Sequence, residues 1–170
     1  MNEIIQLQNI DPTEFNVLFS MLEQITIHKK SSTSNRRGFE IGHRATTFGY
    51  TRARFKRLTG KLYDLSVASI KYPNIYNELL RIGNMFCPFE FTSIHVNKNV
   101  ICPKHKDSKN VSRSMLVSFG NYVGGKIVIE NIEYDAYCRP IIFDGNKLEH
   151  WNTQIEGGGL KYSLVYFSTI

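Results

Sequence analysis

The second half of the chain is a series of short β-branched and aromatic segments separated by turn residues. The first segment is Phe89–Asn97, and four more follow it: Met115–Phe119, Lys126–Glu130, Arg139–Phe143 and Tyr162–Phe167. Gly124-Gly125 and Asp144-Gly145 mark turns between these segments. Short strands at regular spacing are typical of barrels and sandwiches, because such strands bury a face only when a sheet curls or pairs with another. The sequence therefore predicts an all-β second half.

The first half is predicted to be helical. The run Asp11–Glu14 combines an N-cap, a proline at the first helical position and a capping-box glutamate, and apolar residues then repeat at helical spacing as far as Ile25. A second helix is expected from about Asn74 to Ile82. Helices gathered before a β half indicate an α+β fold in which the helices back one sheet.

Length and composition favour one globular domain. The chain has 170 residues, of which 42% are hydrophobic and 21% charged, and no repeat or linker divides it. We expect a single domain over residues 1–170, with a helical and basic part at 1–86 and a β core at 87–170. No apolar run is long enough to span a membrane, and Met1–Gln6 does not resemble a signal peptide, so we expect an intracellular protein, cytoplasmic or nuclear, with no membrane partner.

Positive charge is concentrated in one stretch. The chain carries 21 Lys and Arg against 15 Asp and Glu, a formal charge of +6. Ten of the basic residues lie between His28 and Lys61, where only Glu40 opposes them, so this stretch carries +9 and the remainder 6 − 9 = −3. A basic segment on a mildly acidic domain indicates a polyanion partner such as nucleic acid. A solvated surface loop is the alternative interpretation.

Two histidines and an aspartate in the β half have the spacing of a metal site. His105 and Asp107 are two residues apart, so an extended backbone presents both side chains on one side. His150 follows a predicted strand and turn. Two imidazoles and one carboxylate form the facial triad of non-haem Fe(II) oxygenases, which leaves positions open for a co-substrate and O2. Zinc could bind the same three ligands.

A lysine and a serine follow on the last predicted strand. Lys161 and Ser163 share one face of that strand, and a cation beside a hydroxyl is a good receptor for a carboxylate. A zinc site would leave this pair without a role.

Together these motifs resemble the double-stranded β-helix (jelly-roll) core of the Fe(II)- and 2-oxoglutarate-dependent dioxygenases. The resemblance runs from about Phe91 to Phe167 and rests on four segments: HKD at His105–Asp107, YVGGKIVI at Tyr122–Ile129, PIIFDGNKLEH at Pro140–His150 and KYS at Lys161–Ser163. The resemblance implies that His105, Asp107 and His150 bind Fe(II). It also implies that Lys161 and Ser163 hold the C5 carboxylate of 2-oxoglutarate.

Two longer phrases are similar to one branch of this superfamily. PKHKDSKN at Pro103–Asn110 and FDGNKLEHWN at Phe143–Asn152 resemble the TET/J-binding-protein branch, which hydroxylates the methyl group of pyrimidine bases. Lys161 departs from that branch, whose members usually carry arginine there, and is similar to prolyl hydroxylases instead. An arginine fork binds a carboxylate through two bonds, whereas lysine acts as a point charge.

Further residues are candidates for contacts with ligands. His95, Asn97 and Asn99 alternate along the strand before the metal motif. Asn97 or Asn99 is expected to contact a ligand, the co-substrate in the case of Asn97 or else a base edge, unless these residues only form a polar strand face. The expected substrate contacts mix cations, amides and aromatic rings that suit an unstacked base: Arg44, Tyr50, Arg52, Asn110 and Trp151. Core packing is the alternative for Trp151.

Three functions remain open from the sequence. The first is hydroxylation of a thymine or 5-methylcytosine methyl group in DNA, which the basic segment favours and which requires a flipped or single-stranded nucleotide. The second is a protein hydroxylase of the same fold acting on prolyl or lysyl side chains, which Lys161 favours. The third is a catalytically silent nucleic-acid-binding module, against which the complete set of five site residues argues. The oligomeric state is not predicted.

Overall fold

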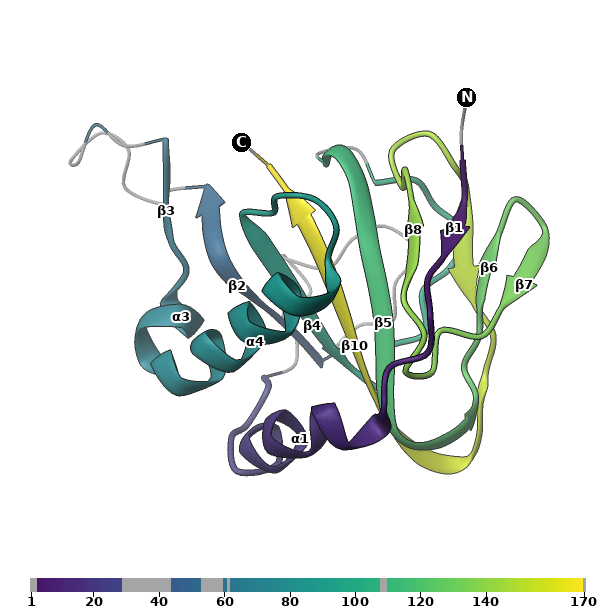
Figure 1. The fold of residues 1–170 in the computed structure, drawn as a ribbon, viewed down its shortest axis with the longest axis horizontal. Coiled ribbons are helices and arrows are strands. Elements are labelled where there is room, and N and C mark those ends of the chain that lie inside the picture. The colour runs from purple at the N-terminus through teal and green to yellow at the C-terminus, as the bar shows by residue number, and fades with distance from the viewer. Residues whose placement is uncertain (1–2, 29–43, 53–59, 61, 108–109, 170) are drawn as a thin grey trace.

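The computed structural model contains two antiparallel β-sheets, and it describes residues 3–28, 44–52, 60, 62–107 and 110–169. In the larger sheet the strand order is β1 (Ile5–Gln6), β8 (Ile141–Phe143), β5 (Val111–Gly124), β10 (Ile155–Ser168), β4 (Ser93–Lys98), β2 (Arg44–Arg52) and β3 (Tyr63–Leu65). The smaller sheet contains β7 (Ile132–Tyr134), β6 (Ile127–Ile129) and β9 (His150–Asn152), in that order. The double-stranded β-helix predicted for the second half is consistent with this arrangement (Figure 1).

The helices lie against one face of the larger sheet (Figure 1). Within the described ranges they are a short 3-10 helix η1 (Pro12–Phe15), α1 (Asn16–Glu23), α3 (Val67–Lys71) and α4 (Pro73–Phe86). The predicted first helix thus begins as a 3-10 turn, in which the Asp11 carboxylate accepts a hydrogen bond of 3.0 Å from the Thr13 amide. Among the described residues, no helix combines the length and apolar character needed to cross a membrane.

Strand alternation gives the larger sheet two different faces. Along β10, Tyr162, Leu164 and Tyr166 are fully buried against the helix layer. The intervening side chains, beginning with Lys161 and Ser163, point to the other face, because successive residues of a strand alternate. The helix-facing side therefore supplies the main hydrophobic core, and the opposite side is left to form a site between the two sheets.

The first part, residues 1–86, which was expected to be helical and basic, contains strands as well as helices. β1, β2 and β3 all lie in this part, and β2 pairs with β4 from Arg44 opposite Lys98 to Gly49 opposite Ser93. Phe48 explains why β2 joins the sheet, since its ring is fully buried in the main core. Of the ten basic residues of the charged stretch, only Arg44 and Arg52 are within the described residues, so the proposed basic surface lies outside them.

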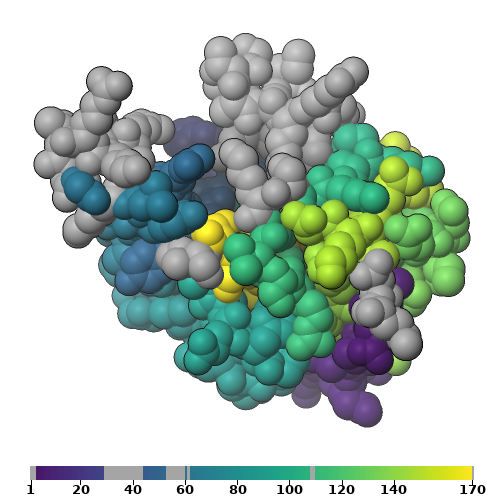
Figure 2. Space-filling view, turned by 90° about the horizontal axis from the view of Figure 1, so that it is seen from above, coloured from purple at the N-terminus to yellow at the C-terminus, as the bar shows by residue number. Residues whose placement is uncertain are grey.

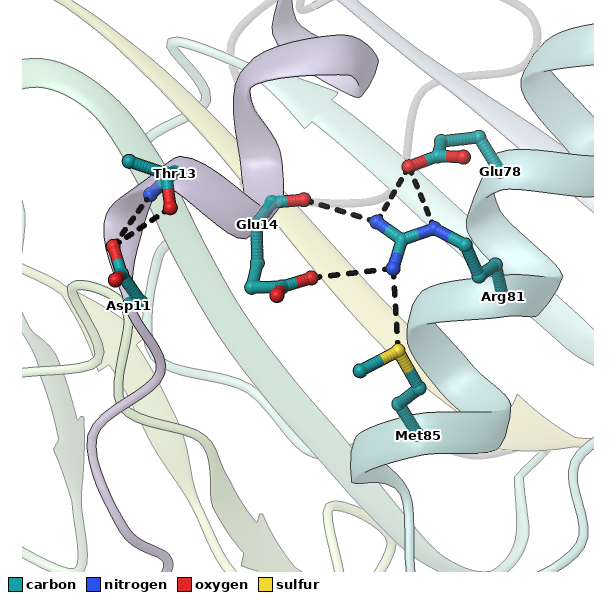
Figure 3. Close-up of polar contacts among 6 residues, drawn as sticks. All are labelled: Asp11, Thr13, Glu14, Glu78, Arg81 and Met85. Carbon is teal, nitrogen blue, oxygen red and sulfur yellow. Dashed lines mark hydrogen bonds and ion pairs between the residues drawn. The ribbon is translucent and has the colours of Figure 1, made fainter.

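An arginine joins the N-terminal helical turn to α4 (Figure 3). The Arg81 guanidinium contacts Glu78 on its own helix at 2.7 Å and the Glu14 carboxylate at 3.2 Å, and it also donates to the Glu14 backbone carbonyl at 3.2 Å. Because Arg81 is exposed, such ion pairs contribute about 1 kcal/mol or less each. Its role is to fix the relative position of two helical segments whose apolar faces supply the binding energy.

Gly83 lets α4 approach the sheet closely. A Cβ atom at this position would lie 2.5 Å from the Tyr166 ring and 2.4 Å from the Phe91 ring. Replacement of Gly83 by alanine is therefore expected to destabilise the fold by about 1–3 kcal/mol, because an overpacked core must shift its rings or its helix. Urea unfolding measures the effect, and Asn84→Ala, on the exposed side of the same helix, is the control. An unchanged urea midpoint for Gly83→Ala would contradict the close packing.

Candidate metal centre

His105, Asp107 and His150 meet between the two sheets. His105 and His150 form a backbone bridge, in which each amide donates to the other residue's carbonyl at 3.0 Å. The Asp107 amide donates to the Gly145 carbonyl at 2.7 Å. This bond holds the loop that carries His105 against the turn that precedes His150. One ligand atom from each of the three side chains lies within 4.8 Å of the others. The structure thus brings together the three residues that the sequence predicted as metal ligands.

Backbone carbonyls orient both imidazole rings. His105 Nδ1 lies 2.6 Å from the Pro103 carbonyl oxygen, and His150 Nδ1 lies 2.9 Å from the Leu148 carbonyl oxygen. A carbonyl only accepts hydrogen bonds, so each Nδ1 carries the proton and, in the neutral ring, each Nε2 carries a lone pair. Such outer contacts fix the tautomer and the direction of metal-binding histidines.

The carboxylate lies between the two Nε2 atoms. Asp107 Oδ1 is 3.4 Å from His105 Nε2, and Oδ2 is 3.4 Å from His150 Nε2. Burial opposes ionisation of Asp107, but hydrogen bonds and attraction from His105 and His150, which act when a ring carries a proton on Nε2 as well as on Nδ1, outweigh it and hold the pKa of this carboxyl well below its usual range. An ionised carboxylate and two oriented imidazoles fit a divalent cation such as Fe(II).

Lys161 is a buried cation on the cavity-facing side of β10. Only 3% of its surface is exposed, and its Nζ donates to the Gly125 carbonyl at 2.6 Å. Burial lowers the pKa of its ammonium group to about 8, despite smaller opposing effects of Cys102 and Asp135. Among the described residues no carboxylate forms an ion pair with it. A buried cation in these surroundings is stabilised by an anionic ligand, so this position fits a carboxylate of 2-oxoglutarate.

A cavity of about 450 Å³ adjoins the three predicted metal ligands. Asn97 and Ser163 line it, and Ser163 Oγ lies 3.1 Å from Ser118 Oγ. Lys161 does not line the cavity itself. It lies two residues before Ser163, on the same face of β10. Seen from above, the yellow C-terminal strand is exposed near the middle of the molecule, between the blue β2–β3 region and green segments (Figure 2). The volume is in the range of small-molecule sites.

Only one of the five predicted substrate contacts lines this cavity. Asn110 does so, and its amide donates to Ser114 Oγ at 3.2 Å and approaches Asp107 Oδ2 at 3.5 Å. Arg44, Tyr50, Arg52 and Trp151 are not among its lining residues. Arg44 instead donates to the Ile27 carbonyl at 2.8 Å. Trp151 follows a proposed ligand directly, and strand alternation turns adjacent side chains to opposite faces.

Thr47 and Gly145 were not predicted as part of the site, and Asn99, a predicted ligand contact, supports the backbone of Lys161. Asn99 has a left-handed backbone, with φ of 52°, and its side-chain oxygen accepts a hydrogen bond of 2.7 Å from the Lys161 amide. Thr47 lines the cavity and bonds His95. Gly145 was recognised only as a turn residue. The alternation of His95, Asn97 and Asn99 was the available sequence signal for two of these contacts, that of Asn99 with Lys161 and that of Thr47 with His95.

Gly145 leaves space for the carboxylate of the site. A Cβ atom there would lie 2.5 Å from Asp107 Oδ2 and 3.2 Å from the His150 ring. Gly145→Ala is therefore expected to displace Asp107 and weaken Mn(II) or Fe(II) binding by about 10–100-fold, the range seen when support for metal ligands is lost. Isothermal titration with Mn(II) measures this, and Asn146→Ala, at the exposed neighbouring residue of the same turn, is the control. Unchanged affinity would show that Asp107 is not the constrained ligand.

Comparisons with known proteins identify the fold. No protein-family model matches the sequence, and no curated protein matches it either. Among solved structures, NgTET1 in complex with 5mC DNA is similar with a TM-score of 0.65 and 19% identity, over 98% of this chain and 72% of that chain. A 2OG-Fe(II) oxygenase family oxidoreductase from Burkholderia pseudomallei has a TM-score of 0.61 and 15% identity, over 96% of this chain and 84% of that one.

A third similar structure is a prolyl-4-hydroxylase from Pseudomonas putida. Its TM-score is 0.57 at 12% identity, and the match covers 98% of this chain and 93% of that chain. At such low identities the comparisons demonstrate a shared fold. The chain has the double-stranded β-helix fold of the 2OG-Fe(II) oxygenases, and the fold class predicted from the sequence is confirmed.

Proposed function

We propose that this chain is an Fe(II)- and 2-oxoglutarate-dependent dioxygenase that hydroxylates the methyl group of a pyrimidine base, thymine or 5-methylcytosine, in nucleic acid. The observation that carries the proposal is the convergence of His105, Asp107 and His150, with both Nε2 atoms directed at one carboxylate. The buried cation of Lys161 is the second support, because it suits the far carboxylate of the co-substrate.

Each group of the site has a defined task in this proposal. Bound Fe(II), with 2-oxoglutarate and O2, supplies the oxidising power that inserts oxygen into a C–H bond. His105, Asp107 and His150 would hold the ion, and the Pro103 and Leu148 carbonyls orient the imidazole lone pairs for it. Lys161 and Ser163 orient the co-substrate through its C5 carboxylate. The cavity walls hold the target methyl group near the ion and exclude water.

Nucleic acid as the substrate is supported by two independent features. The structurally similar NgTET1 was solved with 5mC DNA. The sequence stretch from His28 to Lys61 carries ten basic residues, which suits contacts to phosphates. A methyl group inside a stacked duplex is out of reach of a cavity, so the target nucleotide must be flipped out or single-stranded.

One experiment tests the proposal against its alternatives. The protein is incubated with Fe(II), 2-oxoglutarate, O2 and ascorbate and offered DNA, RNA or peptide pools, and succinate is followed together with a product that gains one oxygen atom. We expect hydroxylated pyrimidine from DNA, and its loss in the His105→Ala, Asp107→Ala double variant. Absence of 2-oxoglutarate and metal binding would exclude both enzyme functions and leave the catalytically silent binding module.

A protein substrate is the second candidate function. Lys161 favours it, because lysine at this place resembles prolyl hydroxylases, and the similar Pseudomonas putida structure is a prolyl-4-hydroxylase. In the same experiment, succinate formation coupled to prolyl or lysyl hydroxylation in the peptide pool, with none in DNA or RNA, would establish this function in place of the first.

Nucleic-acid binding also predicts a strong salt dependence. If phosphate contacts supply most of the affinity, raising the salt concentration from 50 to 200 mM should weaken DNA binding by about 10³-fold for six phosphate contacts. Fluorescence anisotropy with a labelled oligonucleotide at several salt concentrations measures the slope. An affinity that stays flat with salt would argue against nucleic acid as the partner.

A further inference from the structure

The cavity-facing side chains of the larger sheet lie in rungs, which are rows of paired residues running across β10, β4 and β2. Asn97 on β4 is opposite Ser163 on β10, and the next cavity-facing residue of β4, His95, is opposite both Val165 on β10 and Thr47 on β2. All five residues line the cavity. Two residues of a strand span about 7 Å, so the His95 rung is displaced by this distance from the Ser163 rung.

The order of these rungs separates the co-substrate from the substrate. Along β10, Lys161 comes first, then Ser163, then Val165 and Phe167. In the proposed function the co-substrate carboxylate lies at Lys161 and Ser163. His95 is on the side of Ser163 away from Lys161, so it borders the part of the cavity that remains for a substrate.

The His95 ring has a fixed orientation there. Its Nδ1 lies 2.9 Å from the Thr47 hydroxyl, and β2 and β4 are paired at these two residues. A hydroxyl can donate to or accept from an imidazole, so the bond fixes the plane of the ring in either tautomer. An oriented imidazole can form directional hydrogen bonds that select among ligands.

The adjacent wall combines an aromatic surface with a polar atom. Phe167 lines the cavity on the same strand face, two residues beyond Val165. Thr169 also lines it, and among the described residues its buried hydroxyl has no hydrogen-bond partner. Buried polar groups are rarely left unbonded, so a ligand with a polar edge suits this place. An aromatic surface between polar groups fits a flat heterocycle better than an aliphatic side chain.

We propose that His95, oriented by Thr47, binds the polar edge of a flat heterocyclic ring and determines which base the cavity accepts. The proposal rests on the proposed function, since that function places the co-substrate at Lys161 and Ser163. It assigns to the substrate the part of the wall that neither the metal ligands nor the co-substrate receptor uses.

The test compares three single-stranded oligonucleotides that differ at one position, which is 5-methylcytosine, thymine or an abasic site. Binding is measured by fluorescence anisotropy with Mn(II) and 2-oxoglutarate present. The wild type is expected to bind one of the two bases about tenfold more tightly than the abasic site, because a base seated in a cavity adds stacking and hydrogen bonds. His95→Leu should reduce this preference to about twofold or less, while affinity for the abasic oligonucleotide, which reports phosphate contacts, stays unchanged.

Matched variants separate recognition from packing. His95→Gln keeps a polar side chain and should recover part of the preference, and Thr47→Val should give an intermediate value. Thr46→Val is the control, because Thr46 is opposite Val96, a residue of the helix-facing core, and so points away from the cavity. It should retain the wild-type preference.

Three results would overturn the proposal: full base preference in His95→Leu, no base preference in the wild type, or an equal loss of 2-oxoglutarate affinity in His95→Leu. The last would place His95 in the co-substrate site. Failure of the proposed function is recognised separately. If the wild type prefers a base but forms no succinate with Fe(II), 2-oxoglutarate and O2, the role of His95 in base binding is supported and the dioxygenase function is excluded.

Discussion

Replacement of Asp107 by asparagine is expected to abolish metal binding and turnover while the fold is kept. The carboxylate lies 3.4 Å from the Nε2 atoms of both His105 and His150, and it is the only anion of the cluster. An amide of the same shape removes the negative charge and presents an N–H group where the metal would bind. The affinity for Mn(II) should fall by more than about 100-fold, since loss of mere outer support already costs 10–100-fold.

Isothermal titration with Mn(II) and the visible spectrum of the Co(II)-loaded protein measure this loss directly. Asp64→Asn is the matched control, because Asp64 is an exposed residue of β3 and does not belong to the cluster. Circular dichroism should show the same secondary structure for both variants. Wild-type Mn(II) affinity in Asp107→Asn would exclude the three-residue centre, and loss of folded structure would show that Asp107 acts in stability instead.

The β part of the fold was predictable because its signal is local. Tyr162, Leu164 and Tyr166 alternate with cavity-facing residues, and this period of two is visible in the sequence without any partner strand. The β2 strand gives no comparable signal, because basic and polar residues surround Phe48 in the sequence. The stability of β2 depends on its pairing with β4. β1 is shorter still, and Ile5 pairs with Ile142 at the far end of the sequence.

The metal centre was predictable for a similar reason and its surroundings were not. The spacing of His105 and Asp107 places both on one side of an extended segment, whereas the same alternation directs Trp151 away from His150. The carbonyls of Pro103 and Leu148 that orient the imidazoles are backbone atoms, which any residue possesses. Their role follows only from the path of the folded chain, and so does the space that Gly145 leaves beside the carboxylate.

The affinity for 2-oxoglutarate is expected to fall as the pH rises above 8. Burial lowers the pKa of Lys161 from 10.5 to about 8 in the ligand-free protein, so the ammonium form becomes scarce above this pH. The C5 carboxylate needs that charge. In the limit where only the protonated form binds, each further pH unit weakens binding about tenfold. Titration of 2-oxoglutarate into the Mn(II)-loaded protein between pH 7 and 9.5 gives this profile.

Linkage fixes the sign of two accompanying effects. Between pH 8 and 10.5 the unfolded chain keeps a proton at Lys161 that the folded, ligand-free protein has lost, so the contribution of this lysine to the free energy of unfolding rises with pH in that window. Binding of an anion reverses the loss, because it favours the ammonium form. Formation of the complex above pH 8 should therefore take up protons, approaching about one per ligand, which calorimetry in buffers of different ionisation enthalpy measures.

Two variants isolate the charge from the shape of this side chain. Lys161→Met removes the charge and should weaken 2-oxoglutarate binding by about 1.5–3 kcal/mol, or about 10–150-fold, the range for hydrogen bonds to charged groups, without changing Mn(II) affinity. Lys161→Arg keeps a cation that does not titrate, so the pH profile should become flat even if the larger guanidinium lowers the affinity throughout. A wild-type profile that is already flat, or an arginine-variant profile that still falls above pH 8, would show that another group controls co-substrate binding. Within the described part of the chain, only Lys161 combines burial, a cationic head and a place beside Ser163.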